Sequence, residues 1–132
     1  MSAPTPCQIN VADEYMKARL AQHGPEMENQ IEHALSFLSQ DAALKVTLPS
    51  TAFPFTPETT VYGVQGGKTI REYMSANPPA GKWNEASVEE GVVIIRGTVT
   101  KLFLSLHGKA VFTFSGTDTI SNIEFQVSIT KE

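Results

Sequence analysis

The sequence of 132 residues is long enough for one domain with a hydrophobic core, and it contains no apolar stretch near the roughly 20 residues that a membrane helix needs. Its formal net charge of −4, without any basic run, argues against binding to nucleic-acid phosphates. Because the N-terminal segment lacks the apolar core of a signal peptide and Cys7 is the single cysteine, we expect a cytoplasmic protein without an internal disulfide.

Two amphipathic helices are predicted in the first third of the chain. We expect residues 1–9 to form a flexible tail before a single domain of residues 10–132, and Asn10 to cap a first helix that ends at Gly24-Pro25. A second helix is indicated by apolar residues at helical spacing: Met27, Ile31, Ala34, Leu35 and Leu38. Gln40-Asp41 is expected to end this second helix.

Two short strands and a third helix are predicted next. The first strand is indicated by alternating apolar residues: Leu44, Val46 and Leu48. Residues 49–57 (PSTAFPFTP) contain three prolines, so they are expected to form a loop rather than a central strand. Residues 60–65 are expected to form the second strand, and residues 68–74 a short helix after a turn at Gly66-Gly67.

The stretch from Trp83 to Ile129 is rich in β-branched and aromatic residues and is predicted to form about four antiparallel strands. Turns are expected at three places that carry turn-forming residues: Glu90-Gly91, His107-Gly108 and Gly116-Thr117-Asp118. The last strand alternates strictly, so its apolar set should face the helices: Ile123, Phe125 and Val127. Its polar set should face the opposite side: Asn122, Glu124 and Gln126.

The predicted fold class is α+β, with the helices on one face of a bent sheet. Three segments resemble the nuclear transport factor 2-like superfamily, which includes ketosteroid isomerases and small polyketide cyclases: Ala34–Leu48 (ALSFLSQDAALKVTL), Val61–Met74 (VYGVQGGKTIREYM) and Gly116–Ser128 (GTDTISNIEFQVS). The resemblance covers residues 11–130. It implies a cone-shaped, curved, antiparallel-rich sheet wrapped around the N-terminal helices, an apolar pocket at the open end of the cone, and a homodimer.

No motif in the chain specifies a reaction. The run Gly66–Thr69 (GGKT) follows Gly63 too closely for a phosphate-binding loop, and the three histidines are widely separated. We therefore expect no metal and no cofactor.

The resemblance to ketosteroid isomerases places the catalytic acids of those enzymes near Val46 or Thr47 and near Ala110. None of these three residues can move a proton as a carboxyl group does, and Tyr15 alone has a plausible counterpart in those enzymes. Isomerisation of that kind is therefore disfavoured.

Four polar side chains are candidates for a catalytic role: His33, Arg96, Lys101 and Tyr15. Arg96 and Lys101 belong to opposite faces of one strand, and Gly97 could mark a bulge that shifts the pattern. We expect one of the two cations to enter the pocket, and the sequence does not decide which of the two faces of the strand is turned towards the helices. For His33, on the second helix, exposure to water is the alternative.

Six aromatic side chains are expected to line the pocket: Tyr15, Phe53, Phe55, Trp83, Phe112 and Phe125. Phe53 and Phe55 lie in the proline-rich loop, which is expected to form part of a lid. Such a pocket suits a small apolar or aromatic molecule with one anionic or carbonyl end.

Two functions are compatible with this pattern. The first is a small-molecule pocket protein, either a binder or an enzyme of the cyclase, dehydratase or isomerase type. The alternative is a non-enzymatic, dimeric association module whose pocket is filled or vestigial.

Overall fold

The computed structural model describes residues 4–49, 59–77, 81–101, 104–116 and 118–129, with the backbone alone described at 99–101 and 104. Three α-helices are present: α1 (Pro6–Leu20), α2 (Met27–Leu35) and α3 (Ile70–Ala76). The strands are β1 (Leu38–Thr47), β2 (Thr59–Gly63), β3 (Lys82–Trp83), β4 (Ser87–Glu89), β5 (Val92–Lys101), β6 (Leu104–Phe114) and β7 (Ile120–Ser128).

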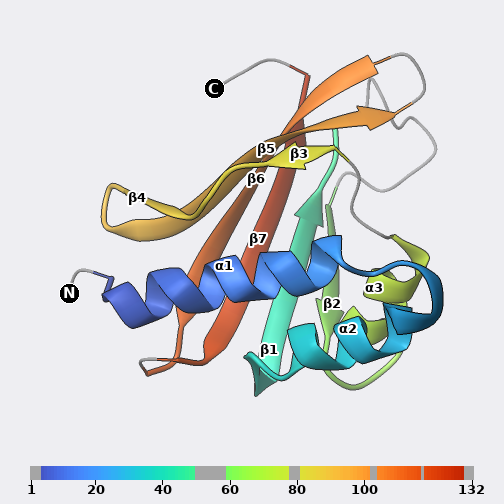
Figure 1. Cartoon of the computed structure of the whole chain (residues 1–132), viewed down its shortest axis with the longest axis horizontal. Coiled ribbons are helices and arrows are strands. Elements are labelled where there is room, and N and C mark those ends of the chain that lie inside the picture. Colours follow the sequence, from blue (N-terminus) through green and yellow to red (C-terminus); the bar gives the residue numbers. More distant parts are fainter. Residues whose placement is uncertain (1–3, 50–58, 78–80, 102–103, 117, 130–132) are drawn as a thin grey trace.

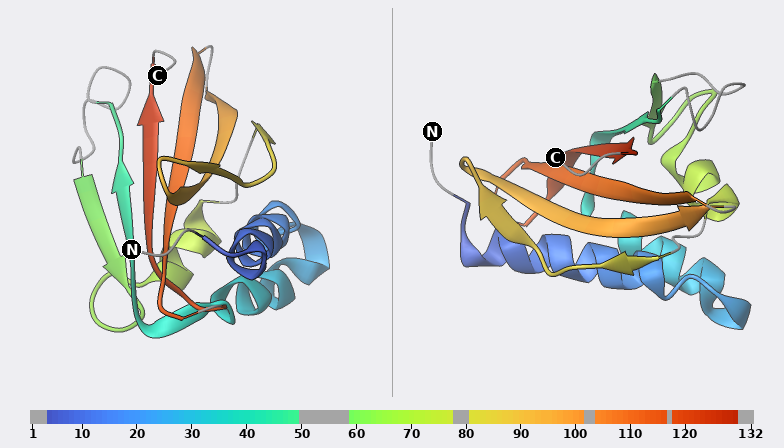
Figure 2. Two further views of the ribbon diagram at one scale, coloured as in Figure 1. Left: turned by 90° about the vertical axis from the view of Figure 1, so that its left-hand side faces the viewer. Right: turned by 90° about the horizontal axis from the view of Figure 1, so that it is seen from above.

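The strands form one curved sheet in the order β2-β1-β7-β6-β5-β3, with β4 also paired to β5. Neighbouring strands are antiparallel except β1 and β7, which are parallel. Figures 1 and 2 show that α1 and α2 lie against one face of this sheet, which we call the inner face, and leave the other, outer face uncovered. The expected α+β fold with a curved, mostly antiparallel sheet is confirmed.

Helix α1 begins earlier than the sequence pattern predicts. Thr5 is its N-cap, because the Thr5 hydroxyl accepts from the Gln8 amide at 3.1 Å and the Gln8 side chain accepts from the Thr5 amide at 3.0 Å. The predicted cap at Asn10 is wrong, and residues 6–9, which we expected to belong to a flexible tail, are helical. A reciprocal capping box with proline at the first helical position satisfies more backbone groups than Asn10 could.

The boundary between α2 and β1 also differs from the prediction. Leu38 is the first residue of β1 instead of the last apolar position of α2, and Gln40-Asp41 lies inside the strand. The cause is pairing with β7: Leu38 lies opposite Ile120, and an irregularity follows before Ala43 pairs with Asn122. Tertiary pairing here overrides the helical spacing of Leu35 and Leu38.

The inner face of the sheet carries the core. Val93 and Ile95 of β5 belong to the buried core cluster, which places these two side chains on the helix side and Arg96, of the opposite parity, on the outer face. In β7, Ile123 and Val127 are buried and Phe125 is partly buried against the core. The predicted orientation of the last strand is therefore confirmed.

Two glycines that look like strand breakers lie inside paired strands. Gly97 of β5 is directly opposite Gly108 of β6 in a register that continues without a shift on both sides. The predicted turn at His107-Gly108 is therefore wrong, and Gly97 does not mark a bulge. Both glycines instead make room for Trp83, since a Cβ on Gly97 would lie 2.6 Å from the Trp83 ring and one on Gly108 would lie 2.5 Å from it.

The other local expectations fare better. The turn at Glu90-Gly91 joins β4 to β5, with both residues at positive φ. Helix α3 is capped by Thr69 and turns Ile70 and Met74 into the core. Among the described residues, no helix has the length and apolar character needed to cross a membrane.

Gly97→Ala tests whether the paired glycines Gly97 and Gly108, which we call the glycine platform, are needed to accommodate the Trp83 ring. Because the added methyl group would collide with the Trp83 ring and with the Lys82 carbonyl oxygen, we expect unfolding in urea to show a loss of about 1–3 kcal/mol, with a changed Trp83 emission spectrum. Gly67→Ala is the matched control, since a Cβ there meets no atom within 4 Å, and it should stay within about 0.5 kcal/mol of the parent. Equal stability of the two variants would contradict the platform.

Candidate functional site

Four of the six aromatic residues predicted for the pocket lie together on the inner face. Tyr15 of α1 and Phe112 of β6 are 4% and 2% exposed, and their rings meet edge to face with centroids 5.8 Å apart. Trp83 of β3 and Phe125 of β7 form a second pair, with centroids 5.7 Å apart and planes inclined by 46°. All four belong to or pack against one hydrophobic cluster.

The two aromatic pairs differ in how well they are covered. Tyr15 and Phe112 are buried where α1 packs on the sheet. Trp83 and Phe125 are only partly buried, and β3, which carries Trp83, lies beyond the part of the sheet that α1 covers in Figure 1. These two rings therefore leave part of their apolar surface accessible.

A buried cation lies next to the first pair, and the sequence interpretation missed it. Arg19 is 7% exposed, and its guanidinium donates to the Gln22 side chain, to the Met74 carbonyl at 3.5 Å and to the Asn77 carbonyl at 3.1 Å. Gln22 also donates to the Met74 carbonyl, at 2.9 Å. Arg19 thus bonds carbonyl groups at the C-terminal end of α3, where the helix dipole favours a positive charge.

Arg19 also contacts two phenols. It interacts electrostatically with Tyr15, and its guanidinium carbon lies 5.9 Å from the centroid of the Tyr73 ring. Burial raises the pKa of Tyr15 and outweighs the opposing effect of Arg19. Burial likewise raises the pKa of Tyr73 to about 12. Both phenols are therefore neutral hydrogen-bond donors at physiological pH.

Of the three positions to which the sequence resemblance assigned catalytic acids, Val46 and Ala110 are apolar and face inwards, whereas Thr47 lies on the outer face. Val46 of β1 and Ala110 of β6 are buried, and both are register partners of Phe125. Among the described residues, the buried polar side chains are Arg19 and Gln22, and neither is a carboxylic acid. The fully buried described residues thus include a cation and a phenol but no general base of the carboxylate type.

Neither His33 nor Arg96 joins this cluster. His33 is exposed, and its ring meets Phe37 edge to face at 5.0 Å. Arg96 lies on the outer face and forms a bidentate ion pair with Glu89, at 2.8 and 2.7 Å. Lys101 is the last residue of β5, and its side chain lies outside the described part of the structure, as do Phe53 and Phe55 altogether.

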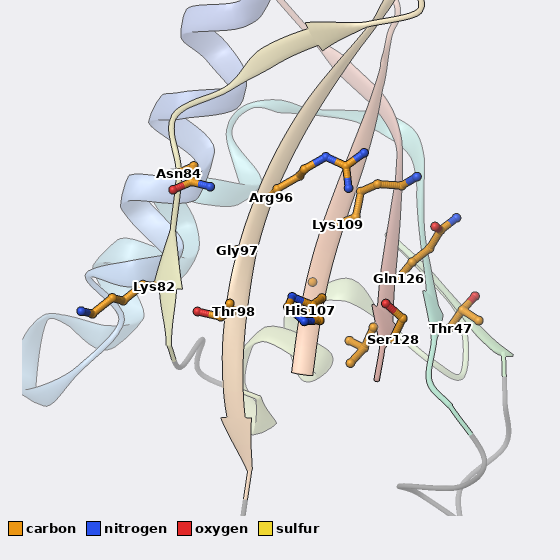
Figure 3. Close-up of a pocket in the computed structure, with 12 residues that line it drawn as sticks. Thr47, Lys82, Asn84, Arg96, Gly97, Thr98, His107, Lys109, Gln126 and Ser128 are labelled. Atoms are coloured by element: carbon orange, nitrogen blue, oxygen red, sulfur yellow. The ribbon is translucent and has the colours of Figure 1, made fainter. Parts of the chain in front are cut away.

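A groove of about 600 Å³ crosses the outer face at the same level as the glycine pair. Register partners form its main row across four strands: Arg96, Lys109, Gln126 and Thr47. A second row follows two residues along: Thr98, His107 and Ser128. Figure 3 shows Arg96 and Lys109 extending side by side, whereas Lys82 points away from them. The described lining contains no aspartate or glutamate.

No cluster that could hold a metal ion was found in the described ranges, where three or more histidine, cysteine, aspartate or glutamate side chains nowhere converge.

Comparison with solved structures assigns the fold. An NTF-2-like protein of unknown function from Burkholderia xenovorans LB400 matches with a TM-score of 0.61 and 13% identity, over 93% of this chain and 84% of that one. A SnoaL-like protein of unknown function from Burkholderia thailandensis E264 matches with a TM-score of 0.61 and 11% identity, over 96% and 99%. The chain therefore has the NTF-2-like fold that its sequence resembles.

A third similar structure is that of an enzyme. SalBIII, an epoxide hydrolase/cyclase-like enzyme with a role in pyran ring formation in the polyether salinomycin, matches with a TM-score of 0.51 and 13% identity, over 94% of this chain and 95% of that one. At such identities the likeness extends to the fold alone. No protein-family model and no curated protein matches the sequence.

Arg19→Met should destabilise the protein by about 1–3 kcal/mol in urea unfolding, because it leaves the Asn77 carbonyl and the Gln22 side-chain oxygen without their donor. Lys17→Met is the control, since Lys17 lies on the same helix with its side chain 73% exposed. A change below about 0.5 kcal/mol in the free energy of unfolding of Arg19→Met would show that the hydrogen bonds from the guanidinium to the end of α3 do not stabilise the fold.

Proposed function

We propose that the protein binds a small apolar or aromatic molecule against the inner face of the sheet, in contact with Trp83 and Phe125. The observation that carries this proposal is the pair of adjacent, incompletely buried aromatic rings, held on a platform of two glycines. Aromatic faces of this kind supply most of the contact area in small-molecule sites. We also propose a cytoplasmic location, because an exposed and unpaired Cys7 fits a reducing compartment.

Only a polar end that reaches the buried part of the cluster would meet Tyr15, with Arg19 beside it. Tyr15 keeps its proton, so its phenol can donate to a carbonyl or anionic oxygen, and Arg19 beside it favours negative charge there. Enzymes that isomerise or cyclise carbonyl compounds use such a donor to stabilise the charge that develops on oxygen. A ketone, quinone or phenolate is therefore the favoured class of ligand end group.

A cyclase-, dehydratase- or isomerase-type reaction is the enzymatic form of this proposal. The NTF-2-like fold is shared with SalBIII, which supports a reaction class of this kind. The fully buried described residues include a donor but no carboxylate base, so proton abstraction would have to use a partly buried group, a group outside the described residues or the ligand itself. Binding is the better supported of the two.

The alternative is a dimeric association module, and one surface feature favours it. Val61 lies on β2, an edge strand of the sheet, and its side chain is 56% exposed. An exposed apolar residue on a sheet edge is a common element of contacts between subunits. Such a module would need no ligand, so the ligand titration separates it from the first proposal.

Trp83 is the only tryptophan, so its emission reports on ligand binding directly. Titration with a panel of steroids, terpenoids, polyketides and fatty acids should give a saturable change in emission for at least one member. Phe125→Ala should weaken that binding by about threefold to tenfold, because one ring of the aromatic pair is lost.

The control for this titration is Val88→Ala on β4, since Val88 is 44% exposed and lies away from the aromatic pair. It should leave the affinity unchanged. Calorimetry on the same samples separates binding from a direct effect of Phe125 on the indole. Emission that stays constant across the whole panel, or equal losses in the two variants, would reject the binding proposal.

The homodimer remains a prediction from the resemblance. Light scattering at micromolar concentration should give twice the chain mass of 14.4 kDa. Val61→Glu, which adds a charge to the β2 edge, should lower that mass if this edge forms the contact. A monomer mass for the parent chain would reject the dimer.

A further inference from the structure

The outer face of the sheet concentrates positive charge on a protein whose net charge is −4. Arg96 and Lys109 are register partners on neighbouring strands, so their side chains leave the same face directly opposite each other. Like charges in such positions repel and destabilise a sheet. The repulsion between Arg96 and Lys109 must therefore be reduced either by solvent or by a nearby anion.

Glu89 supplies part of that compensation. It holds Arg96 through two hydrogen bonds, and this contact, with a further contribution from Lys109, lowers the pKa of the Glu89 carboxyl group. One carboxylate thus stands beside two cations. In the described part of the chain, no ion pair involves Lys109, whereas Lys45 on the same face is paired with Glu124 at 3.8 Å.

The groove around these cations is lined by hydrogen-bonding groups. Its described lining adds the side chains of Asn84, Gln126, Thr47, Thr98, Ser128 and His107, and the backbone of the two glycines. A volume of about 600 Å³ falls in the range of small-molecule sites. Its hydrogen-bonding side chains and two cations distinguish this groove from the aromatic inner face, so the two surfaces do not suit the same ligand.

We propose that this groove binds a small hydroxylated anion, with its phosphate or carboxylate group between Lys109 and Arg96 and its hydroxyl groups on the neighbouring amide and hydroxyl side chains. Lys109 serves as the point charge for the anion, and Glu89 competes with the ligand for Arg96. The site is separate from the proposed ligand site on the inner face and does not depend on it.

Two variants are expected to change the affinity in opposite directions. Lys109→Gln removes the unpaired cation and should weaken binding by about tenfold, the value of one charge-assisted hydrogen bond. Glu89→Gln removes the competing carboxylate and should strengthen binding by about threefold or more. Lys45→Gln is the matched control, because it removes a cation from the same face outside the groove, and it should change the affinity by less than about twofold.

The measurement is an NMR titration of the full chain at low ionic strength with inorganic phosphate, glucose 6-phosphate, gluconate and glucose. Saturable shifts of the Lys109, Gln126 and His107 amides are expected with the anions and not with glucose. Tighter binding of glucose 6-phosphate than of gluconate would identify phosphate as the anionic group, and the reverse order would identify carboxylate. The amide spectra of the variants also report whether each one is folded.

Three results would overturn the proposal. The first is the absence of saturable shifts up to about 10 mM of every anion. The second is an equal loss of affinity in Lys109→Gln and Lys45→Gln, which would indicate unspecific attraction. The third is a change of the groove amides on dilution together with a dimer mass, which would assign this face to an interface between two copies of the chain.

Discussion

The contact between the Trp83 ring and the paired glycines Gly97 and Gly108 is the constraint on which this end of the sheet depends. A Cβ on Gly97 would lie 2.6 Å from the indole and one on Gly108 would lie 2.5 Å from it, so any other residue at either position requires Trp83 or the strands to shift. The contact holds the two-residue strand β3 onto β5 and presents Trp83 beside Phe125 on the inner face. The same glycines form part of the floor of the polar groove on the outer face. The two candidate sites therefore lie back to back on one thin part of the sheet.

Much of this fold could be predicted from periodicity, and the failures have physical causes. The last strand was oriented correctly because Ile123, Phe125 and Val127 alternate with polar residues from Asn122 to Ser128. Gly108 was misread because glycine favours a turn and also permits the close approach of another group, and local sequence does not distinguish these uses. The start of α1 depends on the cap at Thr5, which involves residues that are close in the sequence. The end of α2 depends on the pairing of Leu38 with β7, which local sequence does not reveal.

The site was predictable to a smaller extent. Tyr15, Trp83, Phe112 and Phe125 were identified as inner-face residues because large aromatic side chains seek burial. Arg19 was missed although it follows Tyr15 by four residues, a spacing that places both on one face of α1. The outer groove could not be found from sequence, since Arg96 and Lys109 become neighbours through the register of two strands. Phe53 and Phe55 lie outside the described residues, so the predicted lid stays a prediction.

The parallel pairing of β1 with β7 has a consequence for how the chain reaches its native state. Leu38 is separated from its partner Ile120 by about 80 residues, so this pairing closes a long loop with a large entropic cost. The antiparallel pairs β5 with β6 and β6 with β7 join segments that are close in sequence and can form early. Completion of the sheet at β1 is therefore the slow part of folding, and until then the edge of β7 offers unpaired backbone groups on which chains can associate.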